Sequence, residues 1–249
     1  MSNEGVVRAG VEVLADVEAL ADAAAERVTQ HLTAAIQARG QAVVVLAGGS
    51  TPRPTYERLA GEGFSSRIPW PCVHVVWGDE RCVPPDDAES NYRMARTAWL
   101  DRVPIPPANV HRIHGEDDPA VAASAYEAML RDLVRAAGPP DLVVLGLGED
   151  GHTASLFPGS GAVRERTRWV MPEYSRATGT WRVTLTPVVI NTTAEVLFLV
   201  SGAHKAEILK RVLEGPRRPD DLPAQAIAPS GGRVDWLVDR AAAAGLERP

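Results

Sequence analysis

The sequence has 249 residues, of which 45% are hydrophobic, and its formal net charge is −6 at pH 7. This length is enough for one large α/β domain, or two small ones, with a sizeable core. An acidic chain without a basic patch argues against a nucleic-acid partner. No apolar run approaches the roughly 18 residues of a membrane span, and residues 1–19 contain acids where a signal peptide needs an apolar core. We therefore expect a soluble, cytoplasmic protein with no membrane partner.

The first half of the chain alternates predicted helices with short apolar strands. Apolar residues at helical spacing predict a long helix over about residues 15–39. The wholly apolar runs at 42–47 and 72–77 predict strands that are buried on both faces, as in a parallel sheet. Further helices are predicted from residue 52 to about 60, over 90–100 and over 119–137, with the next strand over 142–145.

The second half continues the alternation. Strands are predicted over 169–171, 181–186, 195–201 and 234–238, with a short helix after Pro187 and a longer one over 203–213. Strands that alternate with helices favour a three-layer α/β/α sandwich. We expect segments 42–47, 72–77, 142–146 and 196–200 to share one mainly parallel sheet. No internal repeat or linker is apparent, so the sequence predicts a single domain over residues 1–249.

Cys72 and Cys82 are the only cysteines, and neither belongs to a pair of Cys-x-x-Cys motifs. A zinc site or a disulfide framework is therefore not expected. The basic residues are almost all arginine, and Lys205 and Lys210 are the only lysines.

Three polar loops follow predicted strands, at residues 47–52, 78–81 and 146–153. In open parallel sheets, ligands bind at the carboxyl ends of the strands. If the three strands are neighbours, these loops line one crevice.

The first loop has the composition of an anion site. Gly48 and Gly49 let the backbone approach a ligand closely, and Ser50 or Thr51 can cap the helix that Pro52 begins. Free amides and the helix dipole then favour an anion, most simply a phosphate. The loop lacks the Gly-Lys-Ser/Thr of a nucleotide P-loop. An ordinary strand–turn–helix connection is the alternative.

The second loop carries Asp79, Glu80 and Arg81, and the third carries Asp150, Gly151 and His152. Arg81 is a suitable planar donor for a carboxylate, a phosphate or a developing oxyanion, although three charges can also form a solvated turn. His152 beside a carboxylate in a tight turn is a candidate general base, and a histidine that caps a helix is the alternative.

Longer strings around these loops resemble the glucosamine-6-phosphate isomerase/6-phosphogluconolactonase family, and most closely its lactonases. The Asp-Gly-His-Thr-Ala-Ser-Leu-Phe-Pro string is highly specific, and the resemblance covers nearly the whole chain. The matching stretches are Leu46-Ala-Gly-Gly-Ser-Thr-Pro52, Trp77-Gly-Asp-Glu-Arg-Cys-Val-Pro84, Ser90-Asn-Tyr92, Leu145-Gly-Leu-Gly-Glu-Asp-Gly-His-Thr-Ala-Ser-Leu-Phe-Pro158, Arg182-Val-Thr-Leu-Thr186, Ser201-Gly-Ala-His-Lys205 and Pro223-Ala-Gln-Ala226.

This resemblance implies a Rossmann-like sandwich that hydrolyses 6-phospho-D-glucono-1,5-lactone to 6-phosphogluconate, with no metal or organic cofactor. His152 would take the proton of the attacking water, and Asp150 would either orient the ring or offset its growing positive charge. Arg81 and backbone amides would receive the oxyanion, although Arg81 can also serve the phosphate. A monomer or weak homo-oligomer is expected. The implied substrate-binding residues are Gly48, Gly49, Ser50, Thr51, Asp79, Arg182 and Lys205.

Three alternatives can be distinguished from the lactonase by specific sequence features. A deaminase of the glucosamine-6-phosphate type would resemble the chain up to the histidine, but would then carry an acid where this chain reads Ser155-Leu-Phe-Pro158, and a tyrosine at the place of Arg81. A non-catalytic sugar-phosphate sensor would need no poised Asp150–His152 pair. A general esterase would need a Gly-x-Ser-x-Gly nucleophile elbow, which is absent from the sequence.

Overall fold

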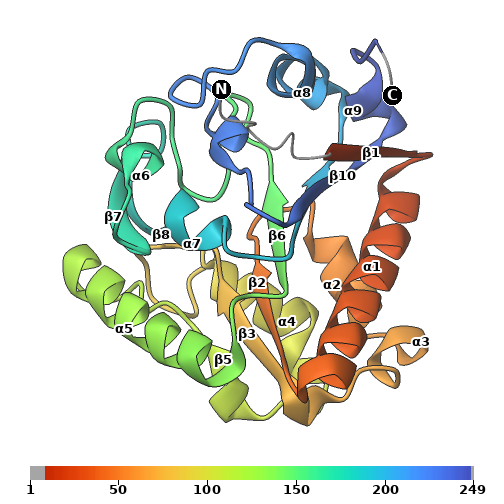
Figure 1. The fold of residues 1–249 in the computed structure, drawn as a ribbon, viewed down its shortest axis with the longest axis vertical. Helices are drawn as coiled ribbons and strands as arrows, with labels where there is room; N and C mark the ends of the chain where they lie inside the picture. Colours follow the sequence, from red (N-terminus) through yellow and green to blue (C-terminus); the bar gives the residue numbers. More distant parts are fainter. Residues whose placement is uncertain (1–8, 248–249) are drawn as a thin grey trace.

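The computed structural model describes residues 9–247, and its centre is a seven-stranded sheet in the order β1-β10-β9-β6-β2-β3-β5 (Figure 1). Every neighbouring pair is parallel. The four segments expected to share one sheet are β2, β3, β6 and β9, so that prediction is confirmed. The bounds are β1 (Ala9–Leu14), β2 (Ala42–Leu46), β3 (Val73–Trp77), β5 (Val110–His111), β6 (Leu142–Gly146), β9 (Glu195–Val200) and β10 (Arg233–Asp239).

The helices flank this sheet, which confirms the predicted α/β class. Figure 1 shows α1 and α2 on one side and α5 with α7 on the other. The strands between these layers are apolar because both faces are covered, and Val43, Val44 and Val45 are fully buried. The helices are α1 (Val17–Arg39), α2 (Arg53–Leu59), α3 (Glu62–Ser65), α4 (Asn91–Ala98), α5 (Pro119–Ala137), α6 (Gly161–Arg164), α7 (Pro187–Ile190), α8 (Ala206–Glu214) and α9 (Arg240–Ala243).

Short 3₁₀ helices join several of these elements. The predicted helix over 203–213 is divided into one such turn followed by α8. The 3₁₀ helices are η1 (Trp70–Cys72), η2 (Leu100–Arg102), η3 (Pro107–Asn109), η4 (Ala203–Lys205) and η5 (Pro223–Ala226).

A second, antiparallel sheet has the order β4-β8-β7 and consists of β4 (Asp79–Arg81), β8 (Thr180–Leu185) and β7 (Val170–Ser175). The sequence predicted β7 and β8 as strands but gave no sign that they leave the main sheet. The prediction that residues 78–81 are only a loop is wrong, because β4 pairs with β8 and sets Arg81 opposite Arg182. β1 was also not predicted, since an edge strand lacks a continuous apolar run.

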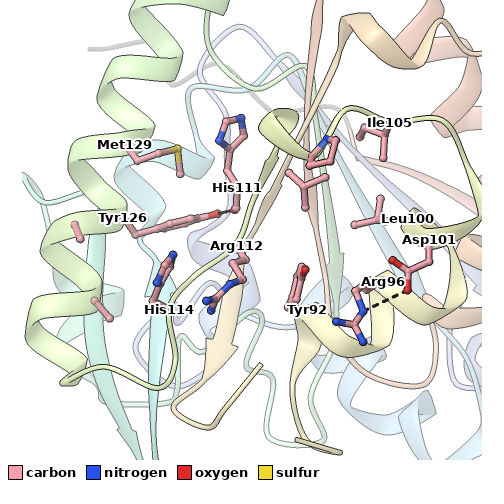
Figure 2. Close-up of a pocket in the computed structure, with 14 residues that line it drawn as sticks. Tyr92, Arg96, Leu100, Asp101, Ile105, His111, Arg112, His114, Tyr126 and Met129 are labelled. Carbon is pink, nitrogen blue, oxygen red and sulfur yellow. Dashed lines mark hydrogen bonds and ion pairs between the residues drawn. The ribbon is translucent and has the colours of Figure 1, made fainter. Parts of the chain in front are cut away.

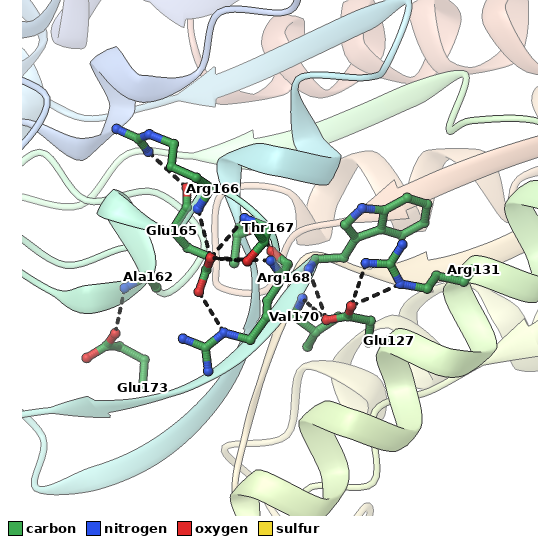
Figure 3. Close-up of polar contacts among 11 residues, drawn as sticks. Glu127, Arg131, Ala162, Glu165, Arg166, Thr167, Arg168, Val170 and Glu173 are labelled. Carbon is green, nitrogen blue, oxygen red and sulfur yellow. Dashed lines mark hydrogen bonds and ion pairs between the residues drawn. The ribbon is translucent and has the colours of Figure 1, made fainter.

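Glu127 of α5 fastens the second sheet to the body of the protein (Figure 3). Its Oε2 accepts hydrogen bonds from the main-chain amides of Trp169, at 2.9 Å, and Val170, at 3.1 Å. Its Oε1 accepts from the Arg131 guanidinium, which also lies 4.3 Å from the centre of the Trp169 ring. Beside this contact, Glu165 accepts from the amides of the turn that leads into β7.

Cys72 and Cys82 are free thiols. Between residues 9 and 247, the chain has no helix with the length and apolarity needed to cross a membrane. The same range contains no cluster of three or more His, Cys, Asp or Glu side chains arranged to hold a metal ion.

We predict that Glu127→Gln lowers the free energy of unfolding by about 1–3 kcal/mol, because the amide keeps only one acceptor oxygen and must abandon either the two amides or Arg131. Urea denaturation measures the change. Glu57→Gln is the matched control, since Glu57 makes an exposed i,i+4 pair with Arg53, and we expect it to cost under about 0.5 kcal/mol. Equal losses in the two variants would contradict the assigned anchor.

Candidate active site

The strands β9, β6, β2 and β3 are neighbours, so the loops that follow them meet at one edge of the sheet. These loops line a cleft of about 800 Å³. All the predicted site residues except Arg182 line this cleft, and Arg182 lines an adjoining cleft together with Arg81 and His152. The shared residues make the two clefts continuous. The predicted residues in the first cleft are Gly48, Gly49, Ser50, Thr51, Asp79, Arg81, Asp150, His152 and Lys205.

The loop after β2 presents unused amides to the cleft. The Tyr56 hydroxyl donates to the carbonyl of Ala47, at 2.8 Å, and accepts from its amide, at 3.1 Å, which fixes the end of the strand. Gly49 then turns the chain with φ +93°, a conformation that favours glycine. Across the described part of the chain, the amides of residues 48–51 donate to no protein acceptor. They are therefore free to bind an anion in the cleft.

The loop after β6 is a tight turn that holds His152 over the same cleft. The amide of Gly148 donates to the carbonyl of His152, at 2.8 Å, and Gly151 turns the chain with φ +85°. A Cβ at Gly148 would lie 2.1 Å from Nδ1 of His152, so only glycine leaves room for the ring at this position. Gly148 thus leaves space for the imidazole beside the turn that carries it.

Asp150 fixes the imidazole. Its Oδ1 lies 2.5 Å from Nδ1 of His152 and also accepts the amide of the same histidine, at 3.0 Å. An ionised carboxylate only accepts hydrogen bonds, so the proton of the neutral ring belongs on Nδ1 and Nε2 keeps a free lone pair. Phe157 packs against the ring, with a centroid separation of 5.1 Å. The predicted closeness of the two side chains is confirmed.

The Asp150 carboxylate is ionised throughout the physiological range. Burial raises its pKa, but the hydrogen bond and the charge of His152 outweigh burial, and the pKa of Asp150 is held below its usual value. A charged Asp150 is what keeps the proton on Nδ1 of His152.

Asp79 and Arg81 reach the cleft from β4. Asp79 is 8% exposed, and its Oδ2 accepts the hydroxyl of Ser155, at 2.6 Å, which ties the histidine turn to the second sheet. The Arg81 guanidinium donates to the carbonyl of Glu89, at 2.6 Å. It also lies 3.6 Å from the Glu89 carboxylate, and the side chain lines both clefts with His152.

Two further cations lie at this site with little compensation. Burial, and next the charge of Arg81, lower the pKa of Arg182, which is 7% exposed and donates to the Thr178 hydroxyl at 3.0 Å. Burial also lowers the pKa of Lys205, although the carboxylates of Glu149 and Asp150 oppose it. Within residues 9–247, neither Arg182 nor Lys205 lies in an ion pair with a carboxylate.

The sequence did not single out several residues that line the clefts. Asn91, from the Ser90-Asn-Tyr92 string, lies at the first cleft, and its position in a matched string was the available signal. Tyr174, Arg176 and Thr178 of the β7–β8 hairpin line the second. No signal identified the hairpin residues, because nothing in the sequence shows that this hairpin folds over the histidine turn.

A separate cavity of about 610 Å³ lies at the β5 edge of the sheet, between α4 and α5 (Figure 2). None of the predicted site residues lines it. Its arginines are already neutralised, since Arg96 pairs with Asp101 and Arg112 pairs with Glu116. The polar groups that can act on a ligand are gathered at the ends of β2, β3, β6 and β9 instead.

The sequence matches the family model described as glucosamine-6-phosphate isomerases/6-phosphogluconolactonase over residues 15–236. The chain is 42% identical over 243 residues to a 6-phosphogluconolactonase of a Nostoc species, an alignment that covers 95% of this chain and 98% of the relative.

Solved structures give the same result. A 6-phosphogluconolactonase from Trypanosoma brucei superposes with a TM-score of 0.83 at 30% identity, covering 96% of this chain and 99% of the other. A monomeric glucosamine-6-phosphate deaminase superposes with a TM-score of 0.81 at 25% identity, covering 95% and 100%. The chain belongs to the glucosamine-6-phosphate isomerase/6-phosphogluconolactonase family.

Proposed function

We propose that this protein is a 6-phosphogluconolactonase that hydrolyses 6-phospho-D-glucono-1,5-lactone to 6-phosphogluconate, the second step of the oxidative pentose phosphate pathway. The observation that carries the proposal is the cleft in which an oriented His152–Asp150 pair shares one space with three cations and a row of free amides. The similarity to named lactonases over nearly the full chain supports it.

The proposed mechanism begins with a water molecule on the Nε2 side of His152. The imidazole takes a proton from the water as the oxygen attacks the lactone carbonyl. Asp150 stabilises the imidazolium that forms, since its carboxylate already accepts the Nδ1 proton. The tetrahedral intermediate then collapses, the ring C–O bond breaks, and the imidazolium gives its proton to the departing ring oxygen, which becomes a hydroxyl.

We assign the two anionic groups of the reacting substrate to different parts of the cleft. The phosphate lies against the free amides of residues 48–51 with Lys205, which lines the cleft on that side. Arg81 faces the oxyanion because it lines both clefts with His152, and Arg182 lies opposite it in the strand register. A fixed cation at the developing charge lowers the barrier in a partly desolvated site.

We also propose that the chain acts as a single domain in the cytoplasm, as a monomer or weak homo-oligomer, on a small-molecule lactone. One continuous hydrophobic core that includes strands of both sheets supports a single domain.

The deciding experiment generates the lactone in situ with glucose-6-phosphate dehydrogenase and follows its loss against spontaneous hydrolysis. Glucosamine-6-phosphate is tested in parallel, because the fold is also similar to a deaminase of that sugar. Acceleration of lactone loss without release of ammonia supports the proposal, and the reverse pattern would replace it.

We predict that His152→Asn lowers turnover by about 10²–10⁴-fold with little change in the Michaelis constant, because the base is lost while the phosphate contacts remain. A thermal melt checks that the variant is folded, and near-normal turnover in a folded variant would remove His152 from the mechanism.

We predict that Lys205→Ala raises the Michaelis constant ~10–100-fold, the equivalent of losing a hydrogen bond to a charged group. Lys210→Ala is the matched control, because the only other lysine pairs with Glu247 at the exposed surface. If Lys205→Ala leaves the Michaelis constant unchanged, the phosphate assignment is wrong.

We predict that Gly148→Ala gives a folded protein with turnover near that of His152→Asn. The added methyl would overlap the imidazole, and a ring that is 32% exposed can swing away from Asp150 without unfolding the turn. Gly63→Ala, where a Cβ meets no atom within 4 Å, serves as the control and should keep full turnover. Full activity of Gly148→Ala would show that the observed ring position is not the working one.

A further inference from the structure

We infer that Glu80 and Asn91 are positioning residues, which lock the anion loop after β2 to the substrate-facing side chains of β4. The inference rests on the proposed function, because it concerns the same cleft. Neither residue was assigned a role by the sequence, and Glu80 does not line the cleft.

Glu80 is a buried carboxylate, 2% exposed, whose oxygens are fully used. Its Oε1 accepts the amides of Arg81 and Asn91, both at 2.7 Å. Its Oε2 accepts the Tyr92 amide, at 2.7 Å, and the Ser90 hydroxyl, at 3.0 Å. One side chain therefore holds the start of α4 against the backbone of β4, directly at Arg81.

Burial raises the pKa of Glu80, although all four hydrogen bonds oppose it. A buried carboxylate that accepts only neutral donors is costly to replace, because any substitution that removes an acceptor leaves a buried donor unpaired. This cost is consistent with a role of Glu80 in holding its neighbours in one arrangement.

Asn91 connects the start of α4 to Asp79, which lines the cleft. Its Nδ2 donates to the main-chain carbonyl of Asp79, at 2.9 Å, and lies 3.3 Å from Oδ1 of the same residue. Both partners are acceptors, so the orientation of the amide is fixed with its nitrogen toward Asp79. Asp79 in turn accepts Ser155 of the histidine turn, at 2.6 Å. Asn91 thus helps to hold a carboxylate that joins β4 to the loop carrying the base.

The other face of the Asn91 amide packs against the anion loop. A Cβ at Gly48 would lie 1.8 Å from Oδ1 and 2.1 Å from Cγ of Asn91. Asn91 is 2% exposed and held by Glu80 and Asp79, so it cannot move aside without breaking hydrogen bonds. The close approach of Gly48 is therefore a contact with a fixed partner, and it sets where the free amides of residues 48–51 lie.

The test is a double-mutant cycle between Gly48→Ala and Asn91→Ala, with inorganic phosphate as the ligand. Isothermal titration calorimetry measures the dissociation constant, and the lactone assay measures turnover and the Michaelis constant. Gly48→Ala alone should weaken phosphate binding by at least ~10-fold. In the Asn91→Ala background, Gly48→Ala should weaken phosphate binding by less than ~3-fold. The clash with the Asn91 amide is then gone, and the effects of mutating two residues in contact are not additive.

Glu80→Gln tests the positioning role of Glu80. It should lower both turnover and phosphate affinity, because the start of α4 shifts together with Arg81 and Asn91. Glu195→Gln is the matched control: Glu195 is an equally buried glutamate, 2% exposed, that pairs with His31 at the opposite end of the sheet. Glu195→Gln should lower the melting temperature but leave turnover and the dissociation constant for phosphate within ~2-fold of the unmodified protein. If Glu80→Gln does not fold, Ser90→Ala, which removes one donor, should give the same changes to a smaller extent.

Independent, multiplying effects of Gly48→Ala and Asn91→Ala would overturn the inference. So would unchanged phosphate affinity in Gly48→Ala, equal responses to Glu80→Gln and Glu195→Gln, or no binding of phosphate by the unmodified protein. If the unmodified protein binds phosphate but does not hydrolyse the lactone, the proposed function fails, and the phosphate cycle still decides the positioning role.

Discussion

The site depends on one constraint, which is that four neighbouring parallel strands end at the same edge of the sheet. Between β2 and β6 the chain order reverses, so the loops after these two strands lead away from each other and leave a crevice between them. The loop after β2 brings free amides to this crevice, and the loop after β6 brings His152. Segments about a hundred residues apart in the sequence become one site only because β2 and β6 pair.

Buried carboxylates convert this arrangement of loops into fixed geometry. Glu80 holds the start of α4 beside β4. Asp239, at the end of β10, holds the loop that follows β9 in the same way. Asp239 is 5% exposed, accepts the hydroxyl of Ser201, at 2.5 Å, and accepts the amide of Gly202. Each carboxylate bonds to neutral donors of a loop, so the loop gains order without an ion pair that would compete for the ligand.

The sequence was informative where a single local cause decides the structure. The buried strands followed from their apolar runs, and the turn at His152 followed from its glycines, because these patterns leave few other conformations. It failed at β4, where Asp79 and Arg81 look like a solvated loop until β8 pairs with them. Glu80 and Asn91 were overlooked for the same reason: their partners lie on another element, and no local pattern reveals a tertiary hydrogen bond. The sequence predicted the residues that line the clefts better than the residues that hold them in place.

The cationic side chains of the cleft repel one another, and residues such as Glu80 and Asn91 hold the surrounding backbone in place. Arg81 and Arg182 lie opposite each other in a strand pair, and burial lowers the pKa of Arg182 and of Lys205. Carboxylates offset part of this charge, since Glu89 pairs with Arg81 at 3.6 Å and Asp79 acts on Arg182. The burial of Arg182 and Lys205 still costs the free protein stability, within a chain whose net charge is −6. An anion bound in the cleft would reduce this cost, so anion binding would stabilise the folded protein.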